Sequence, residues 1–144
     1  MAEGYTEVHD MNYARGYIQW SDRTITNGSW TTNVGNTSTG YTPKGNVIND
    51  AYNMILDIPG KYLVSFHAKF NVNNTTGLRG LRVYKTEENV GEYFIAPTSN
   101  GTTIDVNRVI DSDGNDTIRM GLYQSSGESS VSCTELFATA IKIN

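Results

Sequence analysis

The two histidines are the side chains best suited to acid–base chemistry in this sequence, because an imidazole titrates near neutral pH. His67 lies on the polar side of an alternating segment, and His9 lies in an irregular N-terminal stretch. A histidine base also needs a nucleophile and an orienting carboxylate. The sequence has no Gly-x-Ser-x-Gly turn to present a nucleophile, and neither histidine has metal-ligand spacing to a partner. We therefore assign no catalytic residue and expect His67 to lie on a sheet surface.

Acidic residues form the second group with chemical potential. Asp111, Asp113 and Asp116 surround Gly114, and alternating carboxylates in a tight turn can converge on Ca²⁺. The segment lacks the distal Glu of an EF-hand, and Asp-Gly between two strands is ordinary hairpin chemistry. The hairpin is the favoured interpretation and calcium is the alternative. We assign no metal ligand and expect no cofactor.

Glu87 and Glu88 are an adjacent carboxylate pair. Neighbouring residues of a strand point to opposite faces of the sheet, so these two cannot easily flank one glycosidic bond. They are better interpreted as solvated residues of a hairpin at a sheet edge. With no nucleophile, base and orienter together, we expect a protein that is not an enzyme.

Charge and cysteine content exclude further classes. The charged fraction is 18%, the net charge is -4 and no Lys/Arg cluster occurs, so nucleic-acid binding has no support. Cys133 is the only cysteine, which rules out an intrachain disulfide and a cysteine-based zinc site. The first ten residues contain acidic side chains and no apolar run. They predict neither a signal peptide nor a membrane span, and we expect cytosolic synthesis.

The clearest structural signal is strict alternation along residues 62–73. Its apolar members should point into one core, as in an antiparallel strand with one solvated side; they are Tyr62, Val64, Phe66, Ala68 and Phe70. Further strand-length segments, separated by Asn, Gly, Ser and Asp turns, lie at 17–20, 53–56, 80–85, 91–96, 102–110, 117–123 and 136–143. This pattern predicts an all-β antiparallel sandwich, jelly roll or barrel.

The chain of 144 residues suits one domain. Residues 1–12 lack periodicity and are interpreted as an irregular N-terminal arm that could serve as a docking segment, with the domain at 13–144. Residues 27–49 are rich in Gly, Thr, Asn and Ser, which indicates a loop with short edge strands.

Several motifs occur in a recognisable order. Residues 58–65 form an Ile-Pro turn followed by Gly-x-Tyr at the start of a strand; related motifs lie at 27–32, 77–84, 113–118, 123–127 and 136–143. This order resembles the C1q/tumour-necrosis-factor-like jelly roll, in particular the short versions at the ends of bacteriophage fibres and bacterial surface proteins. The closing strand lacks the Phe-Ser-Gly-Phe of animal members, and the N-terminal stretch lacks a signal peptide, so the phage branch is favoured.

The resemblance implies a homotrimer in which inner-sheet strands lie near a threefold axis. Tyr dominates the aromatic residues, and its amphipathic ring suits interfaces and sugar-stacking surfaces. Tyr62, Phe66 and Phe70 are expected in the core. The residues predicted for the trimer interface are Tyr17, Tyr123 and Phe137.

Two functions follow from this interpretation. The favoured one is a bacteriophage virion surface protein, which would be a head fibre, a capsid decoration protein or the receptor-binding tip of a tail that attaches to the host. Its partners would be other virion proteins and a host cell-surface glycan, with localisation in the virion after synthesis in the host cytoplasm. The alternative is a soluble carbohydrate-binding module. Oligomeric state and location would separate the two.

Overall fold

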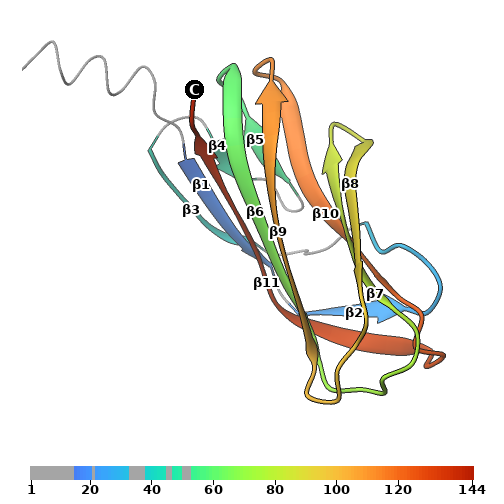
Figure 1. Cartoon of the computed structure of the whole chain (residues 1–144). Helices are drawn as coiled ribbons and strands as arrows, with labels where there is room; N and C mark the ends of the chain where they lie inside the picture. Colours follow the sequence, from blue (N-terminus) through green and yellow to red (C-terminus); the bar gives the residue numbers. More distant parts are fainter. Residues whose placement is uncertain (1–14, 21, 33–37, 45–46, 50–52) are drawn as a thin grey trace, which may run out of the picture.

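A computed structural model describes residues 15–20, 22–32, 38–44, 47–49 and 53–144 of the chain (Figure 1). The described residues form strands, turns and bends without a helix, so the all-β prediction is confirmed. The predicted N-terminal arm at residues 1–12 lies outside the described residues.

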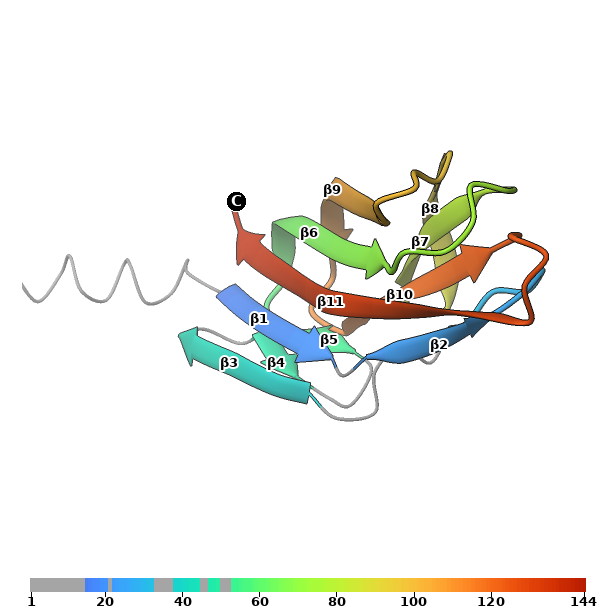
Figure 2. The same cartoon turned by 90° about the horizontal axis from the view of Figure 1, so that it is seen from below.

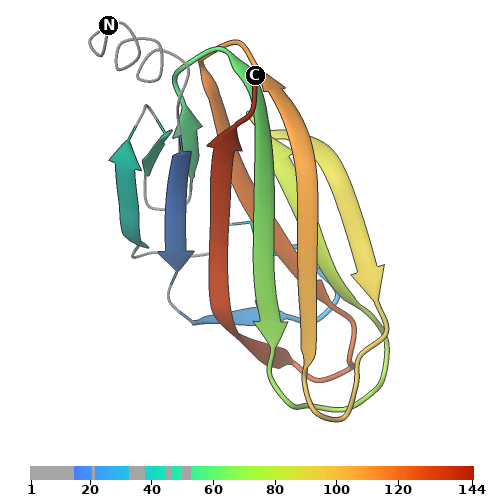
Figure 3. The same cartoon turned by 60° about the vertical axis from the view of Figure 1, so that its left-hand side comes forward.

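The strands form two antiparallel sheets that pack face to face as separate layers (Figure 2). The first sheet has six strands, and Figure 3 shows the face of it that points away from the second sheet. Its order is β3 (Ser38–Lys44), β1 (Arg15–Trp20), β11 (Ser130–Lys142), β6 (Gly60–Phe70) and β9 (Thr102–Ser112), with β2 (Arg23–Thr26) also paired to β11. The second sheet has five strands in the order β4 (Val47–Asn49), β5 (Met54–Leu56), β10 (Asp116–Gln124), β7 (Arg79–Lys85) and β8 (Glu88–Ile95).

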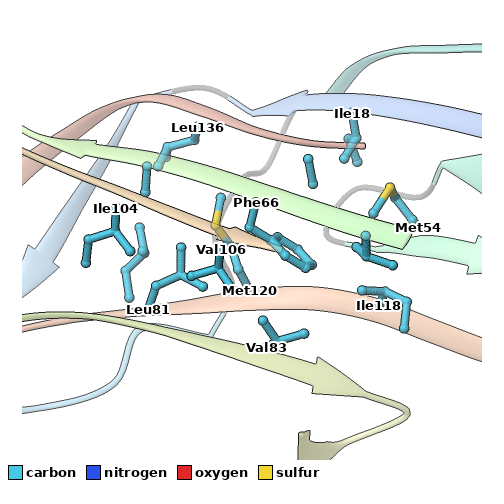
Figure 4. Packing of buried hydrophobic residues seen from close by; sticks show 14 of the residues in the cluster. Ile18, Met54, Phe66, Leu81, Val83, Ile104, Val106, Ile118, Met120 and Leu136 are labelled. Atoms are coloured by element: carbon cyan, nitrogen blue, oxygen red, sulfur yellow. The ribbon is translucent and has the colours of Figure 1, made fainter. Parts of the chain in front are cut away.

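The core lies between the two sheets, and β6 contributes the alternating side chains that its sequence predicts. All five expected core residues of this strand are at most 1% exposed. Figure 4 shows Phe66 of β6 in the same interior as Val106 of β9 and Met120 of β10. Burying a side chain of this size contributes about 1.5–3 kcal/mol relative to leaving it in water. Burial across both sheets therefore holds the layers together.

The turn before β6 shows why its motif takes this form. The Tyr62 hydroxyl donates a 2.8 Å hydrogen bond to the Ile58 carbonyl, which closes the turn onto the strand. Gly60 has φ +151°, which L side chains rarely adopt, and a Cβ there would overlap the main-chain oxygen of Asn144. Glycine is therefore required where the end of the chain returns beside β6.

Both acidic segments discussed above lie in connections between consecutive strands. Thr86 and Glu87 have positive φ of 45° and 71° and link β7 to β8, which begins at Glu88. Gly114, with φ +96°, lies in the connection between β9 and β10. The hairpin interpretation is confirmed for Glu87 and Glu88, because β7 and β8 pair with each other. It is wrong for the Asp-Gly segment, because β9 and β10 belong to different sheets and Gly114 lies in a turn that connects the two layers.

The structure also contains strands that periodicity did not reveal. The segment predicted as a loop with short edge strands contains β3 and β4, which lie at one edge of each sheet. The unexpected additions are β2 and the first half of β11. In β11 the register to β6 shifts between Thr134 and Phe137, where Glu135 has φ +52°. This bulge interrupts the alternation, so the strand began later in the sequence prediction.

Candidate binding faces

The outward face of the six-stranded sheet has an exposed aliphatic row. Leu63 of β6 lies between Ile141 of β11 and Val109 of β9 in the strand register. These three side chains are 38%, 44% and 55% exposed, respectively. We call the outward surface of β1, β11, β6 and β9 the front face.

Aromatic rings lie farther along the front face, beyond the polar row of Thr139, Ser65 and Asn107. The Phe137 ring stacks on the His67 ring, with centroids 4.5 Å apart and an interplanar angle of 13°. Tyr17 of β1 reaches the other side of Phe137, at a centroid distance of 6.0 Å. Two of the three predicted interface residues are thus neighbours on the front face.

The polar side chains of the front face are largely paired with one another. His67 Nδ1 lies 2.5 Å from Asp105 Oδ1, and its Nε2 faces Glu135 at 3.6 Å rather than a hydroxyl nucleophile. Ser65 Oγ donates to Asn107 Oδ1 at 2.6 Å, away from the imidazole. The surface role predicted for His67 fits this geometry. The polar side chains bond to one another, and the aliphatic row is left exposed beside them.

The aspartates of the β9–β10 connection support the turn itself. Asp116 is buried and accepts hydrogen bonds from Thr86 Oγ1 at 2.8 Å and from the Asp113 amide at 3.2 Å. Burial alone would raise the pKa of Asp116, but hydrogen bonds from Ser112, Thr86 and Asp113 outweigh it and leave that pKa below its usual value. Asp111 pairs with Lys61 at 2.7 Å. Across the described ranges, no group of three or more His, Cys, Asp or Glu side chains could hold a metal ion.

The outward face of the five-stranded sheet carries an aromatic group. Tyr123 of β10 and Phe94 of β8 lie on either side of Gly80 in the strand register. Trp30 joins them, with ring centroids 5.3 Å from Tyr123 and 5.7 Å from Phe94. We call Trp30, Phe94 and Tyr123 the aromatic platform.

Solved structures with the same architecture can be compared with this chain. The crystal structure of murine APRIL at pH 8.0 superposes with a TM-score of 0.67 at 11% identity, covering 91% of this chain and 99% of that one. Eiger TNF from S. frugiperda gives 0.67 at 8% identity, covering 92% and 94%. The globular domain of zebrafish complement 1qA protein gives 0.58 at 12% identity, covering 90% and 94%. The fold is a C1q/TNF-like jelly roll.

That fold confirms the architecture inferred from the sequence motifs. At the level of sequence, no family model matches the chain, and the search of curated proteins gives no match. The jelly roll is therefore established by its structure and by motif order rather than by overall sequence likeness. Within the described residues, no helix is long and apolar enough to cross a membrane.

The jelly roll separates the three residues predicted for the interface. Tyr17 and Phe137 lie together on the front face, whereas Tyr123 lies on the opposite sheet. Sequence reasoning did not select Phe94 and Arg82 of that second sheet, nor Trp30, which packs against it. Gly80 and Gly121 were the available signal, because a glycine inside a strand marks the close approach of another group.

Cys133, the single cysteine, is buried in β11 facing the core. Burial raises the pKa of its thiol, and the charge of Arg79 opposes that rise only in part. The protonated thiol is a small apolar group in the core and is a poor nucleophile in the folded protein.

Proposed function

We propose that this jelly roll is a non-enzymatic bacteriophage virion surface protein that assembles as a homotrimer through its front face. The observation that carries the assembly step is the row of Ile141, Leu63 and Val109, exposed side by side on the outward face of the six-stranded sheet. Tyr17 and Phe137 add ring surface farther along the same face. Polar pairs border the row on both sides, Lys61–Asp111 on one side and Ser65–Asn107 on the other. An apolar centre with a polar border is the usual anatomy of a protein interface.

A cyclic arrangement suits this surface. Exposed aliphatic side chains grouped on one face favour association, and a closed ring buries that face without leaving a surface for endless growth. The threefold order is supported by the motif resemblance to trimeric jelly rolls. Three copies around one axis would also present three identical sets of loops to a target.

The oligomer can be tested by sedimentation velocity at low micromolar concentration. A species of three times the 15.9 kDa chain mass supports the proposal, and a species of one chain mass refutes it. Leu63→Glu places a charge in the middle of the aliphatic row and should yield the monomer. Leu78→Glu is the matched control, because Leu78 is 43% exposed but precedes β7 on the other sheet.

The virion role is supported by the motif resemblance to the short phage versions of the fold. It predicts that the protein copurifies with assembled particles of the phage that encodes it. Particles purified by density gradient and probed for this chain would test that role, and particles lacking the chain would refute it. Head and tail fractions probed separately would then distinguish a decoration protein or head fibre from a tail tip.

A further inference from the structure

The aromatic platform lies on the side of the sandwich away from the front face. Tyr123, Gly80 and Phe94 form one cross-strand row on β10, β7 and β8. Phe94 is 48% exposed, and its ring meets Tyr123 edge-on at 5.8 Å. Trp30 is held over the sheet because Thr31 forms two backbone hydrogen bonds with Leu122, of 2.8 and 2.9 Å.

Two glycines allow Trp30 and Phe94 to approach the sheet closely. A Cβ at Gly80 would approach Phe94 to 2.8 Å and Trp30 to 3.1 Å. A Cβ at Gly121 would approach Trp30 to 3.6 Å. The indole therefore covers two positions without side chains on neighbouring strands. The ring planes meet at different angles: Trp30 is tilted by 57° from Phe94 and by 37° from Tyr123, and Phe94 is at 89° to Tyr123. The close approach therefore produces a compact cluster of rings rather than isolated side chains.

The charged groups beside the rings are already paired. The Arg82 guanidinium lies 4.0 Å from the Trp30 ring centroid, and its Nη2 donates to Glu92 Oε1 at 2.7 Å. Arg82 Nη1 also donates to the Tyr84 hydroxyl at 3.1 Å. Arg119 Nη2 donates to Glu87 Oε2 at 2.8 Å. The platform and its surroundings are formally neutral, and the planar polar groups are held in fixed orientations.

These features identify the chemistry of a ligand. A pyranose ring has an apolar C–H face that stacks on an aromatic ring, while its hydroxyls at the rim both donate and accept hydrogen bonds. An arginine–glutamate pair supplies a donor and an acceptor side by side. A phosphorylated or sulfated ligand would instead need an uncompensated cation, whereas both arginines here are balanced by carboxylates. Fixed rings also reduce the entropy lost on binding.

We infer that the aromatic platform is a binding site for a neutral saccharide. A pyranose stacks on the half-exposed Phe94 ring, and its hydroxyls reach the Arg82–Glu92 pair. The site goes beyond the assembly proposed above, because its rings lie on the five-stranded sheet, which the front face does not include. Each chain of an oligomer would carry one such site.

Binding can be measured by isothermal titration with defined hexasaccharides: cellohexaose, chitohexaose and mannohexaose as neutral probes and a heparin hexasaccharide as the anionic probe. The wild-type protein should bind at least one neutral probe and should bind it more tightly than the heparin probe. Phe94→Ala should weaken that binding about tenfold, since an aromatic contact contributes about 0.5–1.5 kcal/mol beyond area burial. Phe94→Tyr keeps the ring and should stay within about twofold.

Two controls separate an effect on the platform from an effect on folding or assembly. Phe137→Ala removes a ring from the front face and should leave saccharide binding unchanged. Thermal unfolding and sedimentation of each variant show whether it folds and in which oligomeric state. Because Phe94 is half exposed, its truncation should leave the fold intact.

Three results would overturn the inference. The first is no binding of any neutral probe by the wild-type protein, or tighter binding of the heparin probe. The second is undiminished binding by both Phe94→Ala and Trp30→Ala. The third is a change of oligomeric state in these two variants, which would make the platform a contact between copies. A monomeric wild type that binds a neutral probe would refute the trimer but not this binding site. A trimeric wild type that binds no neutral probe would refute the binding site but not the trimer.

Discussion

The front face and the aromatic platform cover the same core from opposite sides, yet their surfaces differ in kind. On the front face, aliphatic side chains are exposed in a row across three strands, and the polar side chains around them pair with one another. On the platform, rings lie over glycines, and an arginine stacks on the indole. The first surface fits the broad apolar contact of another protein chain, and the second fits the flat face of a small ring. One sandwich can therefore present two different recognition surfaces because outward residues are free of the packing that constrains inward ones.

The largest effect is expected from the core that both surfaces share. Phe66→Ala should lower the free energy of unfolding by about 3–5 kcal/mol, since a large buried ring leaves a cavity behind. Urea unfolding followed by tryptophan fluorescence measures this directly. Phe94→Ala should lower the same quantity by less than about 1.5 kcal/mol. Equal losses in the two variants would show that the platform is part of the core, and the contrast between surface and interior would fail there.

A charge on each surface tests which one assembles. Phe137→Glu should weaken self-association by about 2 kcal/mol or more, roughly thirtyfold in Kd, as expected for a central aromatic of an interface. Tyr123→Glu should leave the oligomer intact if the front face alone is buried. Sedimentation equilibrium over a concentration series compares the two variants. Dissociation by Tyr123→Glu with no effect of Phe137→Glu would place the interface on the five-stranded sheet instead.

An intermediate effect is expected at the turn between β9 and β10. Asp116→Ala removes a buried carboxylate that accepts hydrogen bonds from Thr86 and Asp113, and should cost roughly 1.5–3 kcal/mol of unfolding free energy. The folded pKa of Asp116 lies below its unfolded value of 3.8. Its stabilisation is therefore fully present above that value and is lost as the pH falls below it, toward the folded pKa.

Stability curves of the wild type and Asp116→Asn between pH 2 and pH 7 measure this contribution. The two curves should converge at the acid end, because a protonated aspartic acid and an asparagine are both neutral. Parallel curves would contradict the assignment of this acid sensitivity to Asp116.

Smaller effects are expected from the ion pairs of the two surfaces. Arg82→Gln on the platform side and Asp111→Asn beside the front face should each cost less than about 1 kcal/mol, because both pairs are open to water. Chemical denaturation of each variant and of the wild type, in low and in high salt, measures these losses of unfolding free energy. A much larger cost for Arg82→Gln would show that its contact with Trp30, rather than the pair with Glu92, stabilises the fold.

The smallest effect is expected from chelation. The carboxylates of Asp113 and Asp116 already serve the turn, because Asp113 Oδ1 accepts from the Asn115 amide at 2.9 Å and Asp116 binds Thr86. EDTA should leave the melting temperature unchanged, with or without added Ca²⁺. A fall in melting temperature that calcium restores and that Asp113→Ala abolishes would establish the calcium alternative.

Much of the fold can be predicted from the chain because its information is local. The alternation at residues 62–70 specifies which side chains of β6 enter the core, and the structure buries all five of them. The Ile-Pro-Gly-x-Tyr motif specifies a turn, since the Tyr62 hydroxyl bonds to a carbonyl only four residues away. Asp-Gly similarly predicts the turn between β9 and β10. Where the alternation is interrupted, as at Glu135, local information fails and the strand is cut short in the prediction.

Only the tertiary structure decides which outward residues share a surface. Tyr123 and Phe137 are close in sequence and similar in chemistry, but β10 and β11 belong to different sheets, so their side chains face opposite sides of the molecule. Trp30 meets Phe94 and Tyr123 because the segment before residue 32 bonds to the edge of β10, a pairing across about ninety residues. A period-two pattern tells inward from outward on one strand, but it carries no information about the strand's neighbours. Sheet order supplies that information, and it arises when the two layers pack on a common core.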